Sequence, residues 1–206
     1  MAYPPRLCFE GAVYHVTARG NNRQPIFLKA RDYHTYLDRL RRAKERFMFT
    51  LHAYALMPNH VHLIIEPSPK TTISQIMQSL GVTYTKLFNK RYGRVGHVFQ
   101  GRFHSRLIEK DAYLLVASRY VHRNPVRAKL CAQPEDYPWS SYRAYIDRRT
   151  DGWRLADPEF VLSLIDLGLH TSAEQRSAYR QFVENPFPAD LVEHLRDENL
   201  RDARHL

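Results

Sequence analysis

The sequence predicts an α+β protein with a ferredoxin-like split βαβ fold, in which two helices cover one face of a four-stranded antiparallel sheet, followed by a helical extension. Two observations lead to this prediction. The spacing of apolar residues switches between the period of a strand and that of a helix, in the order βαββαβα up to residue 124. The net charge then changes sign near residue 150, which divides the chain into residues 1–150 and an acidic extension, residues 151–206.

The four strands are expected where apolar and polar residues alternate. Residues 11–18 are rich in β-formers and end at the turn sequence RGNN. Residues 48–56 and 60–66 alternate in the same way, and the short turn sequence MPN between them predicts a β-hairpin. Residues 97–108 are expected to form the fourth strand, with an interruption at Gly101.

Two helices are expected between these strands. Residues 30–47 carry apolar side chains at helical spacing and basic ones at most other positions, which predicts an amphipathic basic helix. Thr71 or Thr72 can cap a second helix that runs to about Tyr92. Beyond the third helix, described below, a short helix is expected in the segment WSSYRAYI and two more near residues 158–167 and 173–184.

The composition is that of a folded protein, because 44% of the 206 residues are hydrophobic and 12% are aromatic. No apolar segment is long enough to cross a membrane, and the first ten residues lack the apolar run of a signal peptide, so we expect a cytoplasmic protein with no membrane partner. The two cysteines, Cys8 and Cys131, have neither metal-site spacing nor the density of a disulfide scaffold, and both are expected to be reduced.

The charge distribution indicates a polyanionic partner. Residues 1–150 hold 25 lysines and arginines against 10 acidic residues, a net charge of +15, whereas residues 151–206 hold 6 against 11, a net charge of −5. A basic excess of this size suits nucleic acid best and an anionic membrane surface less well. Charge alone leaves open the alternative of a basic but otherwise ordinary globular protein.

The run MPNHVHLII places two histidines, His60 and His62, at the start of a predicted strand. Side chains two positions apart on a strand point to the same face, so both imidazoles would converge on one point, as a pair of metal ligands requires. The alternative is two imidazoles hydrogen-bonded within a sheet. The pair therefore needs support from elsewhere in the chain.

That support comes from the third predicted helix, which is expected to run from about Asp111 to Asn124. Tyr120 and Asn124 are four residues apart and share one side of it. Pro125 disfavours continuation of the helix, so we expect the Asn124 amide to lie at the helix end, turned toward the sheet. Tyr113 is a rival nucleophile on a similar side of the helix, but it has no amide four residues later.

Three separated blocks, LHAYALMPNHVHLII, GHVFQGRFHS and YVHRNPVRA, together resemble the REP-associated tyrosine transposases. These belong to the single-tyrosine HUH transposases of the IS-two-hundred type, which are bacterial and in which HUH denotes two histidines around a hydrophobic residue. The resemblance covers about residues 9–146. It implies a bacterial, nucleoid-associated protein whose residues 1–150 form a single-tyrosine transposase domain.

The resemblance also implies roles for individual residues. Tyr120 would be the nucleophile, His60 and His62 metal ligands, and Asn124 the third ligand, where many relatives use glutamine. Such neutral ligands suit Mg²⁺ or Mn²⁺ acting on a DNA phosphate, because the ion keeps its full charge for the phosphate oxygens. Attack by the tyrosine would leave a 5′-phosphotyrosine and a free 3′-hydroxyl, and a second 3′-hydroxyl could reverse the reaction and transfer the strand.

The expected partner is single-stranded or hairpin DNA rather than a small-molecule substrate, bound by a monomer or a homodimer. His52 lies on the strand next to the histidine pair in the predicted hairpin. It is a candidate to contact and support a metal-binding histidine, or it is simply a strand histidine. The polar turn after the first strand, the even positions of the fourth strand and basic residues of the helices are candidates for DNA contacts, with a solvated surface as the alternative. These candidates are Arg19, Asn21, Arg23, Arg39, Arg42, Lys86, Lys90, Arg91, Gln100, Arg102, His104, Arg123 and Arg127.

Three other functions remain open at this stage. The first is a domesticated hairpin-binding protein that no longer cleaves DNA, against which the intact catalytic residue types argue. The second is a replication or mobilisation initiator with the same chemistry, which the lack of a helicase region disfavours. The third is a metal hydrolase for small substrates, which leaves the charge of +15 unexplained.

Overall fold

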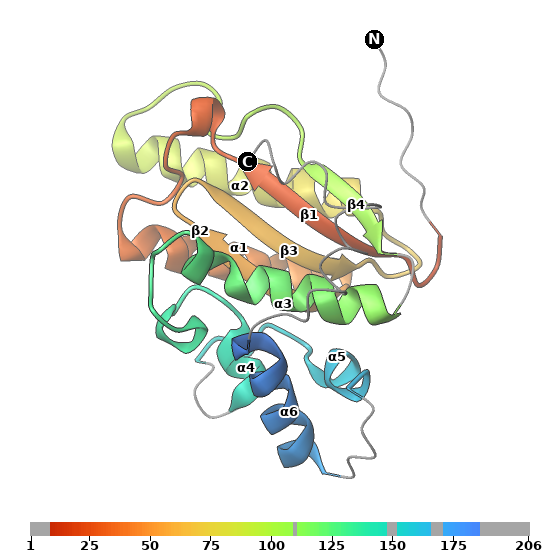
Figure 1. The fold of residues 1–206 in the computed structure, drawn as a ribbon. Coiled ribbons are helices and arrows are strands. Elements are labelled where there is room, and N and C mark those ends of the chain that lie inside the picture. Colours follow the sequence, from red (N-terminus) through yellow and green to blue (C-terminus); the bar gives the residue numbers. More distant parts are fainter. Residues whose placement is uncertain (1–8, 109–110, 148–151, 166–170, 186–206) are drawn as a thin grey trace.

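The computed structural model describes residues 9–108, 111–147, 152–165 and 171–185. Its centre is a four-stranded antiparallel sheet with the strand order β2-β3-β1-β4 (Figure 1). This order, with β1 and β3 in the middle, is that of the split βαβ plan, and the predicted fold class is confirmed. The strands are β1 Val13–Arg19, β2 Thr50–Met57, β3 His60–Glu66 and β4 His104–Ile108.

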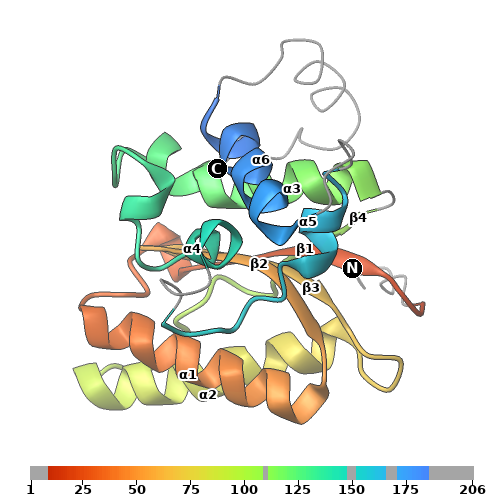
Figure 2. The ribbon, with the colours of Figure 1, turned by 90° about the horizontal axis from the view of Figure 1, so that it is seen from below.

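Three helices enclose the sheet from both sides. Helices α1 (Ala30–Phe47) and α2 (Ile73–Tyr92) lie side by side on one face, whereas α3 (Asp111–Arg127) crosses the opposite face (Figures 1 and 2). The apolar stripes of α1 and α2 pack on alternate residues of the strands and form the larger hydrophobic core. The alternation of the strands therefore sends one set of side chains into this core and the other set toward α3.

The hairpin that carries the histidine pair is built on a two-residue turn. Pro58 and Asn59 connect β2 to β3, with Met57 opposite His60. The pairing shifts by one residue at a bulge between Leu51 and Ala53. The turn is anchored from outside, because the carbonyl oxygen of Pro58 accepts hydrogen bonds from two backbone N–H groups of the loop before α1.

Local signals explain the ends of α2. The Thr72 side chain accepts a hydrogen bond from the backbone of Gln75, whose own side chain accepts one from the Thr72 N–H, and this capping box satisfies donors that the first turn leaves free. At the other end Gly93 takes a left-handed conformation, which glycine adopts at little cost.

Two sequence-based expectations need correction. The fourth strand begins only at His104, and the segment before it touches the sheet through one isolated bridge between Gly20 and Phe99. Helix α3 does not end at Asn124 but continues through Pro125 to Arg127. A proline removes only its own N–H from the helix, and the turn that follows is closed by bonds from Ala128 to the Asn124 carbonyl and onward.

Three further helices pack beside α3, and they share a hydrophobic cluster with the sheet residues Ala53, Ala55 and Ile64 (Figure 2). They are α4 Tyr142–Ile146, α5 Glu159–Ser163 and α6 Ser172–Glu184, and two short 3-10 turns, η1 Asn21–Arg23 and η2 Pro134–Asp136, complete the described structure. Residues 166 and 167 of the second-last predicted helix, and Cys8, lie outside the described residues.

A buried polar chain joins α3 to α6. The His122 imidazole contacts the Tyr179 hydroxyl through Nδ1 and the Ser141 hydroxyl through Nε2, both at 2.8 Å. Tyr179 in turn donates to the Ser118 hydroxyl at 2.8 Å. Every group in this chain has a partner, which is what makes its burial tolerable.

No helix within the described ranges is long and apolar enough to span a membrane.

Candidate active site

Three histidines and one tyrosine form a cluster of rings between the sheet and α3. In the β1–β3 register His15 stands opposite Ile64, so it is a diagonal neighbour of His62 on the same sheet face. The ring centroids of His60 and His62 are 4.8 Å apart. The Tyr120 ring meets the rings of His62 and His15 edge-on, at 5.7 and 5.8 Å between centroids. The structure thus brings together Tyr120 and the two predicted histidines.

The protonation of His60 is set by the preceding residue. Asn59 Nδ2 donates to the carbonyl oxygen of Arg23, so its amide oxygen is the atom that faces His60 Nδ1, at 2.7 Å. An amide oxygen only accepts, which requires the proton of the neutral ring to be on Nδ1. The lone pair is then on Nε2, the nitrogen available to a metal or a proton.

His62 is buried and contacts a second imidazole. Its Nδ1 lies 3.0 Å from His15 Nε2 and 3.4 Å from the Thr17 hydroxyl, and the two imidazole rings are stacked. Burial, followed by the charges of His15 and His60, lowers the pKa of His62 well below its usual value. Burial is also the main reason that the pKa values of His60 and His15 fall to about 4. All three imidazoles are therefore neutral at pH 7.

Tyr120 lies on α3 and is partly buried. The Arg127 guanidinium, two turns further along α3, lies over the Tyr120 ring with 5.1 Å between its central carbon and the ring centroid. The edge of the ring faces the histidines. One side of the tyrosine therefore meets neutral imidazoles and the other a positive charge.

Asn124 is buried one turn beyond Tyr120, and the Nδ2 atom of its amide has no hydrogen-bond partner. A buried amide nitrogen without a partner is a donor that suits a hydrogen-bond acceptor, whereas a metal ion would be held by the amide oxygen of the same side chain. Because the helix continues past Asn124, the position of the amide is fixed by the middle of a helical turn and not by a flexible helix end.

These residues fit a divalent metal. No group of three histidine, cysteine, aspartate or glutamate residues within the described ranges could hold one, so a complete site needs a ligand of another type. Asn124, one helical turn beyond Tyr120, would offer its amide oxygen, and His60 offers Nε2. Two imidazoles and an amide are neutral, which leaves the charge of a bound ion available to a phosphate.

His52 is not part of the cluster, which corrects its predicted place near the histidine pair. His52 Nε2 contacts a Glu66 carboxylate oxygen at 3.1 Å, at the end of β3 remote from His60. The hairpin pairs His60 with the last residue of β2, far from His52. The bulge also changes the direction in which the side chain at position 52 points. Tyr54 belongs to the larger hydrophobic core, on the α1 and α2 side of the sheet.

Some predicted DNA-binding residues surround the ring cluster. Arg19 stands opposite His60 on β1, and His104 of β4 stands opposite Thr17 on the same sheet face. The backbone N–H of Gln100 donates to the Arg19 carbonyl oxygen, which brings the loop before β4 to this end of the sheet. The remaining three residues of this group are Asn21, Arg23 and Arg102, which are exposed on the loops next to Arg19 and β4.

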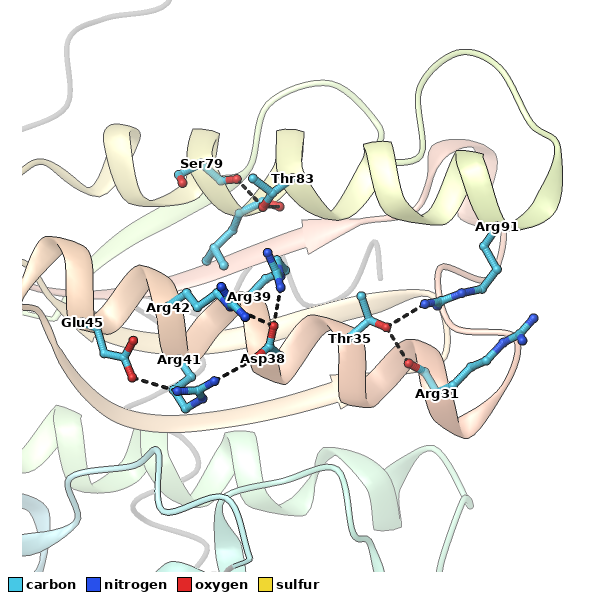
Figure 3. Close-up of polar contacts among 11 residues, drawn as sticks. Arg31, Thr35, Asp38, Arg39, Arg41, Arg42, Glu45, Ser79, Thr83 and Arg91 are labelled. Carbon is cyan, nitrogen blue, oxygen red and sulfur yellow. Dashed lines mark hydrogen bonds and ion pairs between the residues drawn. The ribbon is translucent and has the colours of Figure 1, made fainter.

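The basic residues of α1 and α2 lie on the other side of the sheet. Arg39 and Arg42 pair with Asp38, and Arg91 donates to Thr35 (Figure 3). Arg91 also pairs with the buried Asp32. Lys86 and Lys90 are exposed on α2. Contacts of these five residues with DNA stay a prediction.

The Arg123 side chain makes its hydrogen bonds within the protein. Its guanidinium donates to the carbonyl oxygens of Val183 and Glu184 at the end of α6, and the neighbouring Arg119 donates to those of Phe182 and Asn185. The carboxyl end of a helix has carbonyl groups without internal donors, and these two arginines satisfy them.

Sequence reasoning missed His15 and Asn59. A single histidine in an alternating strand matches no motif, and only the register of β1 against β3 shows that it touches His62. Asn59 was seen only as a turn residue. The position of Asn59 in the sequence could have indicated its role, because an amide directly before a metal-binding histidine can reach the second ring nitrogen.

Comparisons with known proteins identify a family and similar folds. A family model described as "Transposase IS200 like" matches residues 8–124, more than half of the chain. The chain is similar to a solved structure described as the REP-associated tyrosine transposase bound to a REP hairpin, with a TM-score of 0.61 and 20% sequence identity, over 76% of this chain and 92% of that one. A second structure, whose description names a transposase from Deinococcus radiodurans, has a TM-score of 0.42 and 15% identity, over 56% and 92% of the two chains. A search of curated proteins gave no significant match.

The matched region contains His60, His62, Tyr120 and Asn124, and the fold agrees with that of the structure at a TM-score of 0.61. The chain therefore belongs to the IS200-like transposase family.

Proposed function

We propose that this transposase is a metal-dependent single-strand DNA endonuclease and strand transferase that binds hairpin DNA at palindromic repeats and cleaves beside the hairpin through Tyr120. One observation carries the proposal: the Tyr120 ring on α3 lies against the rings of His62 and His15, and the His62 ring in turn contacts that of His60. The REP hairpin in the similar solved structure supports the choice of a hairpin substrate.

In this proposal the Tyr120 oxygen forms a bond to phosphorus while the bond from phosphorus to the 3′-oxygen breaks. The product is a 5′-phosphotyrosine, and the departing 3′-oxygen takes up a proton. His60, His62 and Asn124 would hold Mg²⁺ or Mn²⁺, which supplies electrostatic stabilisation of the phosphate oxygens when bound. One phosphoester bond breaks as another forms, so no bond energy is lost to hydrolysis, and a 3′-hydroxyl of another strand can reverse the step and complete the transfer.

Arg127 and Arg19 serve the same reaction from two sides. Arg127 lies over the Tyr120 ring, and Arg19 shares the sheet face of His60. A phosphate brought to the Tyr120 hydroxyl therefore meets positive charge from the end of α3 and from the end of β1. We expect these two arginines to hold the DNA backbone in line for attack.

The polarity of cleavage tests this proposal. A hairpin oligonucleotide with a single-stranded extension is labelled at either its 3′ or its 5′ end and incubated with the protein and Mn²⁺. The proposal predicts that the 3′ label becomes bound to protein in a denaturant-resistant adduct, whereas the 5′ label is released on a fragment with a 3′-hydroxyl. Tyr120→Phe should abolish the adduct, and Tyr113→Phe, a matched change on the same helix, should retain it.

Two results would contradict the proposal. An adduct formed by Tyr120→Phe would exclude this residue as the nucleophile. Normal hairpin binding without cleavage in either Mg²⁺ or Mn²⁺ would instead identify a hairpin-binding protein that no longer cuts.

A further inference from the structure

His15 is the one member of the ring cluster to which neither the sequence motifs nor the proposed reaction gives a role. It is only partly exposed in the middle of β1, a central strand of the sheet. Its Nε2 atom lies 3.0 Å from His62 Nδ1, and the two rings are stacked with an angle of 21° between their planes. A contact at this distance between two ring nitrogens is a hydrogen bond in which one ring donates and the other accepts.

We propose that His15 is a positioning residue that accepts the Nδ1 proton of His62 in a hydrogen bond, and so fixes the ring and presents the Nε2 lone pair to the metal. This inference rests on the proposed function in one respect, because it takes His62 as a metal ligand. His15 then does from β1 what Asn59 does for His60 from the hairpin turn. Both imidazoles have Nδ1 occupied by a neighbour, and both have Nε2 available.

Two other roles fit the geometry less well. His15 is not itself a third ligand, because no three histidine or acidic residues within the described ranges are arranged to hold an ion. It is not placed to take the proton of Tyr120 either, because its contact with that residue is between ring edges and its Nε2 is already occupied by His62. The short contact in the cluster is the one between the two imidazoles.

The consequence of losing this contact is specific. Without an acceptor at position 15, His62 can rotate, or move its proton to Nε2, and either change removes the lone pair that a metal needs. The Thr17 hydroxyl, at 3.4 Å, is a weaker partner for the same nitrogen. Removal of such an outer partner typically lowers metal affinity by about 10- to 100-fold.

Two substitutions distinguish a hydrogen-bonding role from simple filling of space. Phenylalanine in His15→Phe keeps a ring of similar size and removes the acceptor, whereas glutamine in His15→Gln offers an amide oxygen as acceptor in place of the ring. We expect His15→Phe to weaken Mn²⁺ binding by at least tenfold and His15→Gln to remain within about threefold of the wild-type protein. Mn²⁺ binding is measured on the full chain by titration calorimetry and by the electron paramagnetic resonance signal of free Mn²⁺.

The matched control is His52→Gln, which removes another buried histidine of the same sheet, remote from His62, and should leave Mn²⁺ affinity unchanged. Melting temperature and hairpin affinity in EDTA show whether each variant is folded.

The order of the two affinities decides the inference. If His15→Phe binds Mn²⁺ as well as the wild type while His15→Gln does not, His15 only fills space and the inference is overturned. Mn²⁺ binding by the wild type that does not depend on His60, tested with His60→Ala, also overturns it. A protein that shows the expected order but forms no DNA adduct would retain this role of His15 and contradict only the proposed function.

Discussion

Several histidines of this protein are held neutral by their surroundings, and His122 is the most deeply buried example. Its two ring nitrogens contact Tyr179 and Ser141, and burial lowers its pKa to about 3. Because Tyr179 donates its own proton to Ser118, its oxygen accepts from His122 Nδ1. The Ser141 hydroxyl lies at Nε2 and also reaches the Tyr54 carbonyl oxygen, at 3.3 Å. Burial is what disfavours the charged form of this imidazole.

This arrangement predicts acid sensitivity. A histidine whose pKa is lower in the folded than in the unfolded state does not change the free energy of unfolding above pH 6.5. As the pH falls from 6.5 toward the folded pKa, only the unfolded state takes up the proton, so the free energy of unfolding decreases. His122, His60 and His15 should each steepen the pH dependence of the unfolding free energy by about 1.4 kcal/mol per pH unit between pH 6.5 and about 4. Urea unfolding at pH 5.0, 6.0 and 7.5 measures this dependence.

The variant His122→Gln tests the assignment to one residue. Glutamine can donate to Tyr179 and accept from Ser141 without titrating, so it should flatten the dependence by about 1.4 kcal/mol per pH unit whatever it does to stability at pH 7.5. An unchanged slope would show that His122 is already protonated in the folded protein.

At the scale of elements, the loop after β1 sets the position of the hairpin turn. A Cβ atom on Gly20 would lie 2.1 Å from the Gln24 carbonyl oxygen and 2.8 Å from a side-chain carbon of Ile26, and the backbone N–H of Gly20 donates to the Asn59 carbonyl oxygen at 2.7 Å. Nothing larger than glycine fits without moving this loop from the turn that carries Asn59. The loop and the histidine pair are therefore coupled through one close backbone contact.

We expect Gly20→Ala to destabilise the protein by about 2–4 kcal/mol, as an overpacking change against backbone does, and to weaken Mn²⁺ binding. Gly81→Ala is the matched control, because a Cβ there meets nothing within 4 Å on helix α2, and it should stabilise by about 0.5–1 kcal/mol. Thermal unfolding and Mn²⁺ titration of both variants measure these effects. Equal stability of the two variants would refute the close-contact argument.

The contact between α3 and α6 is a second coupled pair of elements. Arg119 is buried and donates through two nitrogens to the carbonyl oxygens of Phe182 and Asn185, both at 2.7 Å. Arg119→Ala should lower the free energy of unfolding by about 2–4 kcal/mol, because it leaves helix-terminal carbonyls without donors. Arg41→Ala, which removes an exposed arginine paired with Asp38 and Glu45, should cost less than about 1 kcal/mol. Urea unfolding compares them, and similar losses would mean that α6 is not held by Arg119.

The elements that sequence patterns predicted best are those with strong local signals. Residues 30–47 and 60–66 form α1 and β3 with the predicted bounds, and α2 begins after the predicted cap at Thr72. The end of α3 was not predictable from Pro125, because packing on the sheet and on the extension keeps the helix intact beyond it. Local sequence patterns also could not predict the neighbours of His52 and His15. Cross-strand neighbours depend on a bulge and a register that no local pattern encodes.

At the scale of the whole molecule, the basic residues lie on two surfaces, one on each side of the sheet. The net charge of residues 1–150 is +15, yet the basic residues of α1 pair with acidic ones on the face of the sheet away from Tyr120. Arg19 and Arg127 lie on the Tyr120 side. If the DNA backbone is held there, hairpin affinity must depend on salt through a small number of phosphate contacts.

We expect a threefold rise in salt concentration to weaken hairpin binding by about 20- to 50-fold if about four phosphates are contacted. Arg127→Gln should reduce the slope of log affinity against log salt by about 0.7–0.9, the share of one phosphate. Arg41→Gln, on the opposite face, should leave the slope unchanged. Fluorescence anisotropy in EDTA measures binding without cleavage, and a reduced slope for Arg41→Gln alone would place the DNA on the α1 side.

The central claim is that Tyr120 attacks DNA beside the His60–His62 pair, and mass spectrometry of the adduct tests it most directly. Trypsin cuts after Arg119 and Arg123, so Tyr120 is released in the peptide YVHR, whereas Tyr113 is released in DAYLLVASR. After reaction with hairpin DNA and Mn²⁺, followed by nuclease and trypsin digestion, the account predicts a nucleotide phosphate attached to YVHR. A nucleotide on DAYLLVASR or on any other tyrosine peptide, with YVHR unmodified, would contradict it.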